Sequence, residues 1–80
     1  MDAWLEAAVA RLAQETGVAV ADYALSPAEV DELLELARIA AHESGERTNA
    51  PLICYLIGLA RGRHASGLED LVDAVAAKAP

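Results

Sequence analysis

Apolar residues recur at helical spacing in four stretches of the chain, which glycines and polar turns separate. The first stretch runs from Ala3 to about Thr16. Asp2 is placed to cap it, and Gly17 is placed to end it, because glycine accepts a left-handed backbone at little cost. Residues three and four apart share one face of a helix, so this stretch has one apolar stripe: Trp4, Leu5, Ala8, Val9 and Leu12.

The second stretch carries the clearest start signal, the run Ser26-Pro27-Ala28-Glu29. The serine caps the helix, the proline takes the first helical position, and the glutamate reaches back to the amide of the cap. We expect the helix to end near Glu43 or Ser44, before Gly45. Its buried face is predicted to comprise Val30, Leu33, Leu34, Ala37, Ala40 and Ala41.

The third stretch, LICYLIGLA at residues 52–60, is apolar around its whole circumference. Thr48 or Asn49 is placed to cap this helix, and Gly62 is placed to end it. Its apolar residues fall on two sides: Leu52, Ile53, Leu56, Ile57 and Ala60 on one, and Cys54, Tyr55 and Leu59 on the other. A helix of this kind is buried on all sides, so we expect it at the centre of the fold or in an interface.

The fourth stretch opens with a second capping-box run, Ser66-Gly67-Leu68-Glu69, and Lys78 suits its negative end. Its apolar stripe comprises Leu68, Leu71, Val72, Val75 and Ala76. Between the first two helices, a connector is expected to pack on the bundle through Val18, Val20 and Tyr23. The pattern therefore predicts one all-α domain over residues 1–80, a compact four-helix fold with the apolar third helix at its centre.

Charge and composition change this picture in two ways. The net charge is −7, and residues 1–37 alone carry eight acids and one base, whereas residues 38–64 carry four bases and two acids. An acidic chain of this kind argues against a nucleic-acid ligand. Because 19 of the 80 residues are alanine, the core is expected to be thin. Docking on a protein partner, or self-association as a homodimer, is therefore expected.

Cys54 is the single cysteine and lies inside the apolar third helix, where a buried thiol acts as filler. It cannot form an internal disulfide, so nothing indicates an oxidising compartment. The start MDAWLE lacks the basic and apolar regions of a signal peptide, and LICYLIGLA is far shorter than the ~20 residues that span a bilayer. We therefore expect a cytoplasmic protein.

The turn after the second helix holds the candidate ligand site. There, His42 and Arg47, with Tyr55 nearby, are placed to hold an anion or a carboxylate of a partner. The alternative is structural: His42 caps carbonyls at the helix end, and Arg47 pairs with Glu43 or Glu46. A second basic group at the end of the third helix is expected to lie too far away to join this site: Arg61, Arg63 and His64.

No motif in the chain indicates catalysis, a cofactor or a metal. The single cysteine and the wide separation of His42 and His64 argue against a zinc site, and no glycine-rich phosphate loop follows a strand. We therefore expect a non-enzyme. A candidate interface along the third helix, in which two glycines four residues apart admit a neighbouring helix, comprises Cys54, Tyr55, Gly58, Leu59 and Gly62.

The run of residues 33–63 is similar to an uncharacterised actinobacterial family of small helical domains, and Trp4-Leu5 fits as well. In that family a leucine-rich helix ends in Ala-His, followed by a basic turn, Ala-Pro-Leu and an apolar helix that ends in Gly. The matching positions are Leu36, Ala37, Arg38, Ala41, His42, Arg47, Ala50, Pro51, Leu52, Leu56 and Gly58.

The resemblance implies a link to molybdenum-cofactor biosynthesis. Relatives occur alone or joined to a nucleotidyltransferase that attaches a guanine nucleotide to molybdopterin, and the catalytic parts belong to that enzyme. We therefore expect a non-catalytic accessory or interaction domain that docks on such a nucleotidyltransferase. Two alternatives remain open, a module that binds an anionic small molecule near His42 and Arg47 and a purely structural homodimer.

Overall fold

The computed structural model describes residues 2–64 and 67–76, and within these ranges every regular element is helical. The elements in chain order are α1 (Ala3–Thr16), the short 3-10 helix η1 (Val20–Tyr23), α2 (Pro27–Ser44), α3 (Asn49–Arg63) and α4 (Leu68–Ala76). The prediction of an all-α fold with four α-helices is therefore confirmed. The predicted cap Ser66 and the predicted end residue Lys78 lie outside the described residues.

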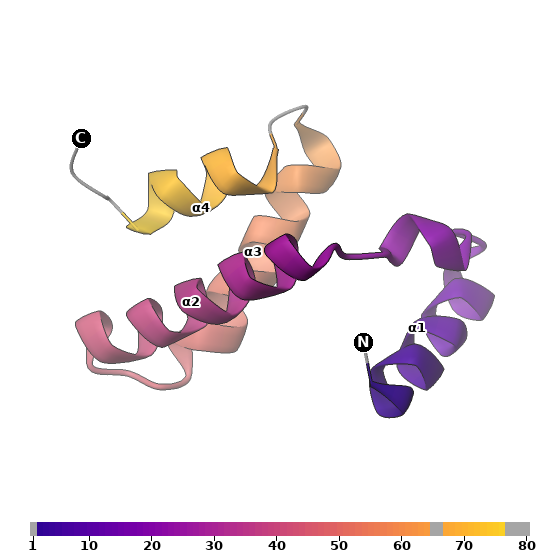
Figure 1. Cartoon of the computed structure of the whole chain (residues 1–80), viewed down its shortest axis with the longest axis horizontal. Coiled ribbons are helices and arrows are strands. Elements are labelled where there is room, and N and C mark those ends of the chain that lie inside the picture. Colours follow the sequence, from indigo (N-terminus) through magenta and orange to yellow (C-terminus); the bar gives the residue numbers. More distant parts are fainter. Residues whose placement is uncertain (1, 65–66, 77–80) are drawn as a thin grey trace.

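The helices form two parts of unequal size (Figure 1). In the larger part, α2 packs against both α3 and α4, and α3 also packs against α4. In the smaller part, α1 packs against η1 and against no other described element. An extended segment after Tyr23 joins η1 to α2, so α1 stands beside the larger part as an arm.

The core lies where α2, α3 and α4 meet. Its four buried side chains are Leu36, Ile57, Leu68 and Val72, and Leu33, Ile53 and Leu71 pack around them. Each helix of the larger part contributes to this cluster, whereas α1 buries no residue at all. The predicted stripe on α4 is confirmed at Leu68, Leu71 and Val72, but Val75 is exposed.

Burial of α3 on all sides within the single chain and burial of Leu34 were wrong predictions, whereas the alternative that α3 forms an interface stays a prediction. The third helix is not covered on all sides of the single chain, because α2 and α4 pack on one side of it and only Ile57 is fully buried. On α2, the buried residue is Leu36 rather than Leu34, whose exposed fraction is 65%. Two residues turn a helix by about 200°, so Leu34 points away from the neighbours that cover Leu36. The three helices all pack on one another, and α2 supplies its most buried side chain, Leu36, to their common core.

The connector also differs from the prediction. Val18 and Val20 are exposed instead of packing on the bundle, and the hydroxyl groups of Tyr23 and Thr16 lie 2.9 Å apart in a hydrogen bond. This bond ties η1 to the end of α1. The connector therefore packs on α1 and does not cover α2, α3 or α4.

Local signals at the helix ends were largely correct. The amide of Leu5 donates to Asp2 Oδ1 over 2.8 Å, and Gly17 and Gly45 adopt left-handed φ angles of 76° and 74°. At α3, Thr48 precedes the helix as predicted but makes no side-chain capping bond, and the helix runs on to Arg63 rather than ending at Gly62.

The capping box at the start of α2 also joins α2 to α3. The amide of Ser26 donates to Glu29 Oε1 over 2.8 Å, and the amide of Glu29 donates back to Ser26 Oγ over 3.1 Å. The second oxygen of Glu29 lies 2.6 Å from Arg61 Nη2. The Ser26 amide and then the Arg61 guanidinium lower the pKa of Glu29, so this link is lost only as the pH falls through that lowered pKa.

We expect Ser26→Ala to lower the free energy of unfolding by about 1 kcal/mol, because it removes the oxygen that caps the Glu29 amide. Ser26→Asp keeps an acceptor at this position and is the matched control. Urea denaturation followed by circular dichroism measures both variants. Equal destabilisation by alanine and aspartate would contradict a capping role.

Two neighbouring residues of α3 test its one-sided burial. Ile57 is 3% exposed and Leu56 is 53% exposed, so Ile57→Ala is expected to cost about 2–5 kcal/mol and Leu56→Ala within about 0.5 kcal/mol. Thermal unfolding at a concentration where sedimentation finds a monomer measures the difference. If Leu56→Ala costs as much as Ile57→Ala, the outer side of α3 is covered within the single chain.

Candidate functional site

The side of α3 that faces away from the core is apolar and open. Four large side chains, each three or four residues from two of the others, form what we call the outer face of α3: Leu52, Tyr55, Leu56 and Leu59. All four are exposed, and Tyr55 is 70% exposed. They are uncovered because Ile53 and Ile57, on the opposite side, already contact α2 and α4. A row of this kind on a monomer marks a surface for binding.

The predicted interface residues lie along this helix, as expected. Tyr55, Gly58, Leu59 and Gly62 are exposed, whereas Cys54 is partly buried, with its thiol 4.0 Å from the carbonyl oxygen of Leu33. A Cβ atom added at either glycine would meet no described neighbour within 4 Å. The close approach of a neighbouring helix expected at Gly58 is therefore not made within the described chain. The surface of α3 at the two glycines is not covered by another described element.

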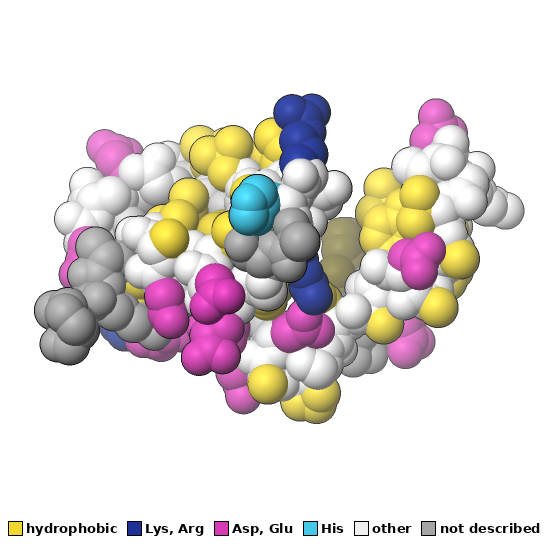
Figure 2. Space-filling view, turned by 90° about the horizontal axis from the view of Figure 1, so that it is seen from above, with side chains coloured by type: hydrophobic (Ala, Val, Ile, Leu, Met, Phe, Trp, Pro, Cys, Tyr) yellow, Lys and Arg dark blue, Asp and Glu magenta, His cyan; other side chains and the backbone are white. Residues whose placement is uncertain are grey.

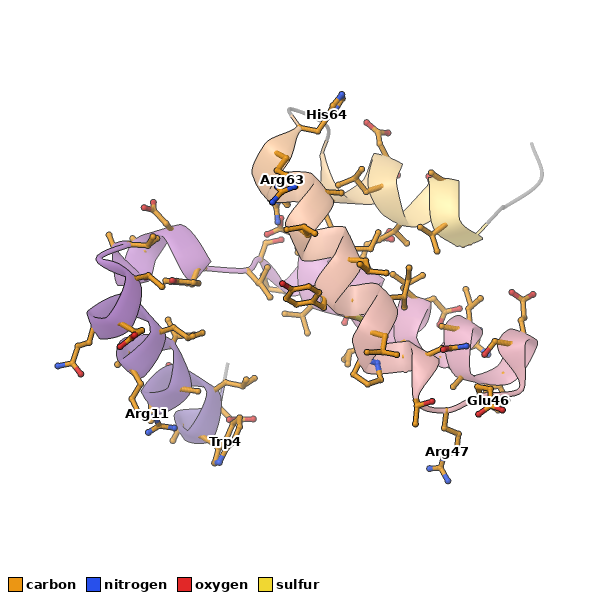
Figure 3. All side chains as sticks on the ribbon, turned by 180° about the vertical axis from the view of Figure 1, so that it is seen from behind. Trp4, Arg11, Glu46, Arg47, Arg63 and His64 are labelled. Atoms are coloured by element: carbon orange, nitrogen blue, oxygen red, sulfur yellow. The ribbon has the colours of Figure 1, made fainter. Side chains whose placement is uncertain are left out.

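Basic side chains lie at both ends of α3. Figure 3 places Arg63 and His64 at the carboxyl end of the helix and Arg47 beyond its amino end. The helix itself contains no acidic residue, and Arg61 is already paired with Glu29. As the sequence indicated, the two basic groups are separate. A ligand that covers the outer face therefore meets Arg63 near one end and Arg47, beside Glu46, near the other.

The three predicted ligand residues are all exposed, at separate places. His42 is in the last turn of α2, Arg47 is in the turn that follows, and Tyr55 is on the outer face of α3. None of their side chains makes a hydrogen bond or ion pair with another described residue. The structural alternative, in which Arg47 pairs with Glu43 or Glu46, was therefore wrong, because the structure contains neither ion pair among the described residues. An anion site formed by these three residues stays a prediction.

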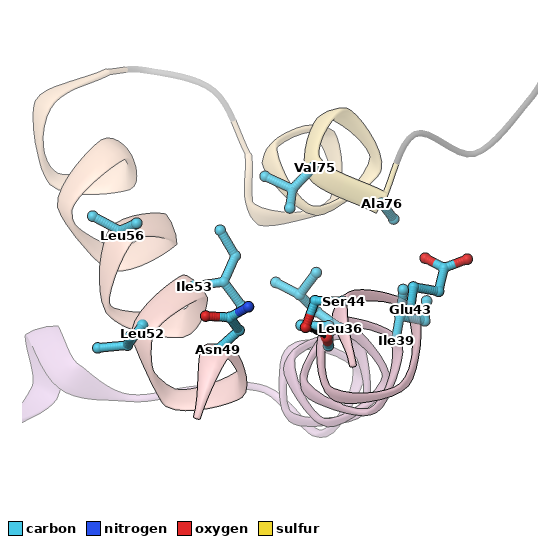
Figure 4. A pocket seen from close by; sticks show the side chains of 11 residues that line it. Leu36, Ile39, Glu43, Ser44, Asn49, Leu52, Ile53, Leu56, Val75 and Ala76 are labelled. Atoms are coloured by element: carbon cyan, nitrogen blue, oxygen red, sulfur yellow. Dashed lines mark hydrogen bonds between the residues drawn. The ribbon is translucent and has the colours of Figure 1, made fainter. Parts of the chain in front are cut away.

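The structure contains an apolar groove that the sequence did not reveal. It has a volume of about 410 Å³ and lies between the second half of α2, the first half of α3 and the end of α4 (Figure 4). Leu52 and Leu56 of the outer face form one wall, Val75 and Ala76 form the other, and Leu36 lies between them. The outer face of α3 therefore continues into a hollow. Its position depends on the angle between α3 and α4, which the sequence pattern does not specify.

Apolar side chains reach the surface on both parts of the molecule (Figure 2). Trp4 on the arm is 72% exposed, and Leu12 and Leu25 are also exposed. The described helices include none that is both long and apolar enough to cross a bilayer. Exposed apolar side chains that gather in patches mark places where another molecule can bind.

Burial and the grouping of side chains bear on what the described residues can do chemically. Burial raises the pKa of the Cys54 thiol, which keeps it protonated and weakens it as a nucleophile at neutral pH. Within residues 2–64 and 67–76, no group of three or more metal-ligating side chains gathers in one place. The buried set in these ranges is wholly hydrophobic, so no ionisable side chain is held in a closed pocket there. The exposed apolar faces are what the fold offers to another molecule.

Fold and surface together define a small all-α domain with open apolar faces. The chain belongs to the family described as "Domain of unknown function (DUF6457)", whose model matches residues 1–80. This confirms an uncharacterised domain family and indicates no catalytic one, but it carries no link to actinobacteria or to fusions with nucleotidyltransferases. No curated protein and no solved structure gives a significant match.

The raised pKa of Cys54 predicts slow alkylation. At neutral pH we expect the thiol to react with iodoacetamide more slowly than free cysteine does, because less of it is thiolate. The rate should rise with pH to a midpoint above the usual thiol value. Mass spectrometry of timed samples measures the profile, and the urea-unfolded chain is the control. A native rate equal to the unfolded rate at every pH would refute the prediction.

Proposed function

We propose that this chain is a non-catalytic interaction domain that binds a partner protein through the outer face of α3. The observation that carries the proposal is that α3 exposes more large apolar side chains than it buries. One is fully buried, and four large ones are exposed in a continuous row. Covering a large apolar side chain is worth about 1.5–3 kcal/mol, so a protein that covers this row gains substantial free energy.

The composition of the face supports a protein partner. Tyr55 lies in the middle of the row with leucines on either side, and interfaces concentrate binding energy in central aromatic residues surrounded by apolar ones. Arg47 and Arg63 lie beyond the two ends. A partner surface with an apolar centre and acidic residues at its rim fits this pattern, because rim charges speed association and exclude wrong partners.

The partner that the sequence resemblance suggests is a nucleotidyltransferase of molybdenum-cofactor biosynthesis. In this proposal the present chain supplies no catalytic group and acts as an accessory domain. It positions or stabilises the enzyme that attaches guanine nucleotide to molybdopterin. The support for this partner is the resemblance alone, whereas the support for the binding face is the exposed row on α3.

Tyr55→Ala tests the proposal. We expect it to weaken binding to the nucleotidyltransferase at least about tenfold, measured by isothermal titration calorimetry, because it removes the central anchor. Leu34→Ala is the matched control, since Leu34 is exposed to a similar degree on α2. Circular dichroism should find both variants folded.

Two results would contradict the proposal in different ways. If the purified nucleotidyltransferase does not bind the wild-type chain, the partner is wrong. If it binds but Tyr55→Ala and Leu34→Ala have equal effects, the binding face is wrong. In the second case, the affinity lost on single truncations along α1 and α2 would locate the true contact.

A further inference from the structure

A second apolar groove, of about 610 Å³, lies between the arm and the larger part of the molecule. Leu5 and Val9 of α1 line one wall, and Val30, Leu33 and Leu34 of α2 line the other. The two walls belong to helices that do not pack on each other. The groove is therefore a gap between two apolar helix faces that do not cover each other, although Leu33 also packs against the core.

The apolar face of α1 is not covered by any helix of the larger part. The helix α1 has 14 residues, none of them buried, and it packs only against η1 among the described elements. Isolated helices shorter than ~12–15 residues are marginal in water, and most helical stability in proteins comes from packing of the apolar face. A well-formed α1 with Trp4, Leu5 and Leu12 exposed therefore indicates a packing partner outside the single chain.

The apolar arc of α1 is wide enough for two neighbours. Val9 and Trp4 are five residues apart, which places them about 140° from each other around the helix. Val9 faces the groove, whereas Trp4 is 72% exposed at the other edge of the arc. Closing α1 onto α2 of its own chain would cover the Val9 edge and leave Trp4 in water. Insertion between two helices covers both edges.

We infer that two copies of this chain exchange arms. In this dimer the α1 helix of each copy inserts into the groove between α1 and α2 of the other copy. The occupant is a second copy because the groove requires a helix with two apolar edges, and α1 is such a helix. Each chain carries both the groove and its insert, so the contact is self-complementary, as in two-fold symmetric dimers.

The small size of the core is an independent reason to expect a dimer. Among the described residues of the larger part, four side chains are buried, and a domain of this size is marginal on its own. Arm exchange adds the exposed side chains of the arm, the connector and the start of α2 to the buried set: Trp4, Leu5, Leu12, Leu25 and Leu34. The dimer therefore supplies the apolar burial that the single chain lacks.

The net charge of the chain opposes dimerisation, so the salt dependence of association can identify this dimer. Each copy carries a net charge of −7, and Asp2 lies at the edge of the groove. Two acidic copies repel one another, and salt screens this repulsion. Association by arm exchange should therefore strengthen as the salt concentration rises, the opposite of an interface formed by ion pairs.

The test uses the full chain and its single tryptophan, Trp4. Sedimentation velocity and tryptophan fluorescence are followed over the same concentration series, at low and at high salt. We expect a monomer–dimer transition, a shift of the Trp4 emission to shorter wavelength with the same midpoint, and a lower midpoint at high salt. Leu34→Ala should raise the dissociation constant at least about tenfold.

Tyr55→Ala is the matched control, because Tyr55 lies on the outer face of α3 and does not line the groove. It should leave the dimer unchanged. Three results would overturn the inference. The first is a monomer at all concentrations with short-wavelength emission, which means that α1 closes on its own chain. The second is a monomer with a water-exposed Trp4. The third is a dimer that Tyr55→Ala weakens and Leu34→Ala does not.

These outcomes are separate from the test of the proposed function, which measures binding of a different protein at a different face. A chain that dimerises but does not bind the nucleotidyltransferase supports arm exchange and contradicts the proposed partner. A chain that binds the nucleotidyltransferase through Tyr55 but stays monomeric supports the binding face and overturns arm exchange.

Discussion

The structure depends on the packing of α3 and α4 against one helix, α2. Leu36 lies between them and is buried with Ile57, Leu68 and Val72. Because both neighbours approach α2 from the side of Leu36, the other sides of α2 and α3 receive no cover from within the larger part. The exposed leucines and Tyr55 follow directly from this geometry. A three-helix cluster of this size encloses one small core and cannot also bury a helix that is apolar all round.

The polar contacts of the chain serve to hold this arrangement. Glu29 accepts the amide of Ser26 with one oxygen and pairs with Arg61 through the other, so the start of α2 and the end of α3 are held at one point. The Arg38–Glu35 pair, in contrast, joins two exposed residues of the same helix and contributes little to the fold. The link that matters is therefore the one that connects two helices and reuses a capping residue.

We propose that the uncovered faces carry the function of this domain. The outer face of α3 and the groove beside α1 both consist of large apolar side chains on rigid helices, and they lie on different parts of the molecule. Separate faces allow two kinds of neighbour at once, a second copy at the arm and a different protein at α3. Cys54 neighbours the outer face, and burial raises the pKa of its thiol, which keeps the thiol protonated at neutral pH.

The sequence by itself determined the helices and most of their ends, because caps, glycines and the spacing of apolar residues act within a few residues of chain. Asp2, Gly17, the Ser26–Glu29 box and Gly45 all have the roles that their neighbours predict. Only the tertiary structure decided which apolar faces are covered. Leu36 and Leu34 are equally hydrophobic, and so are Ile57 and Leu56, yet one of each pair is buried and the other exposed. Periodicity specifies that a face seeks a neighbour, but the angles at which α3 and α4 meet α2 determine which face receives one.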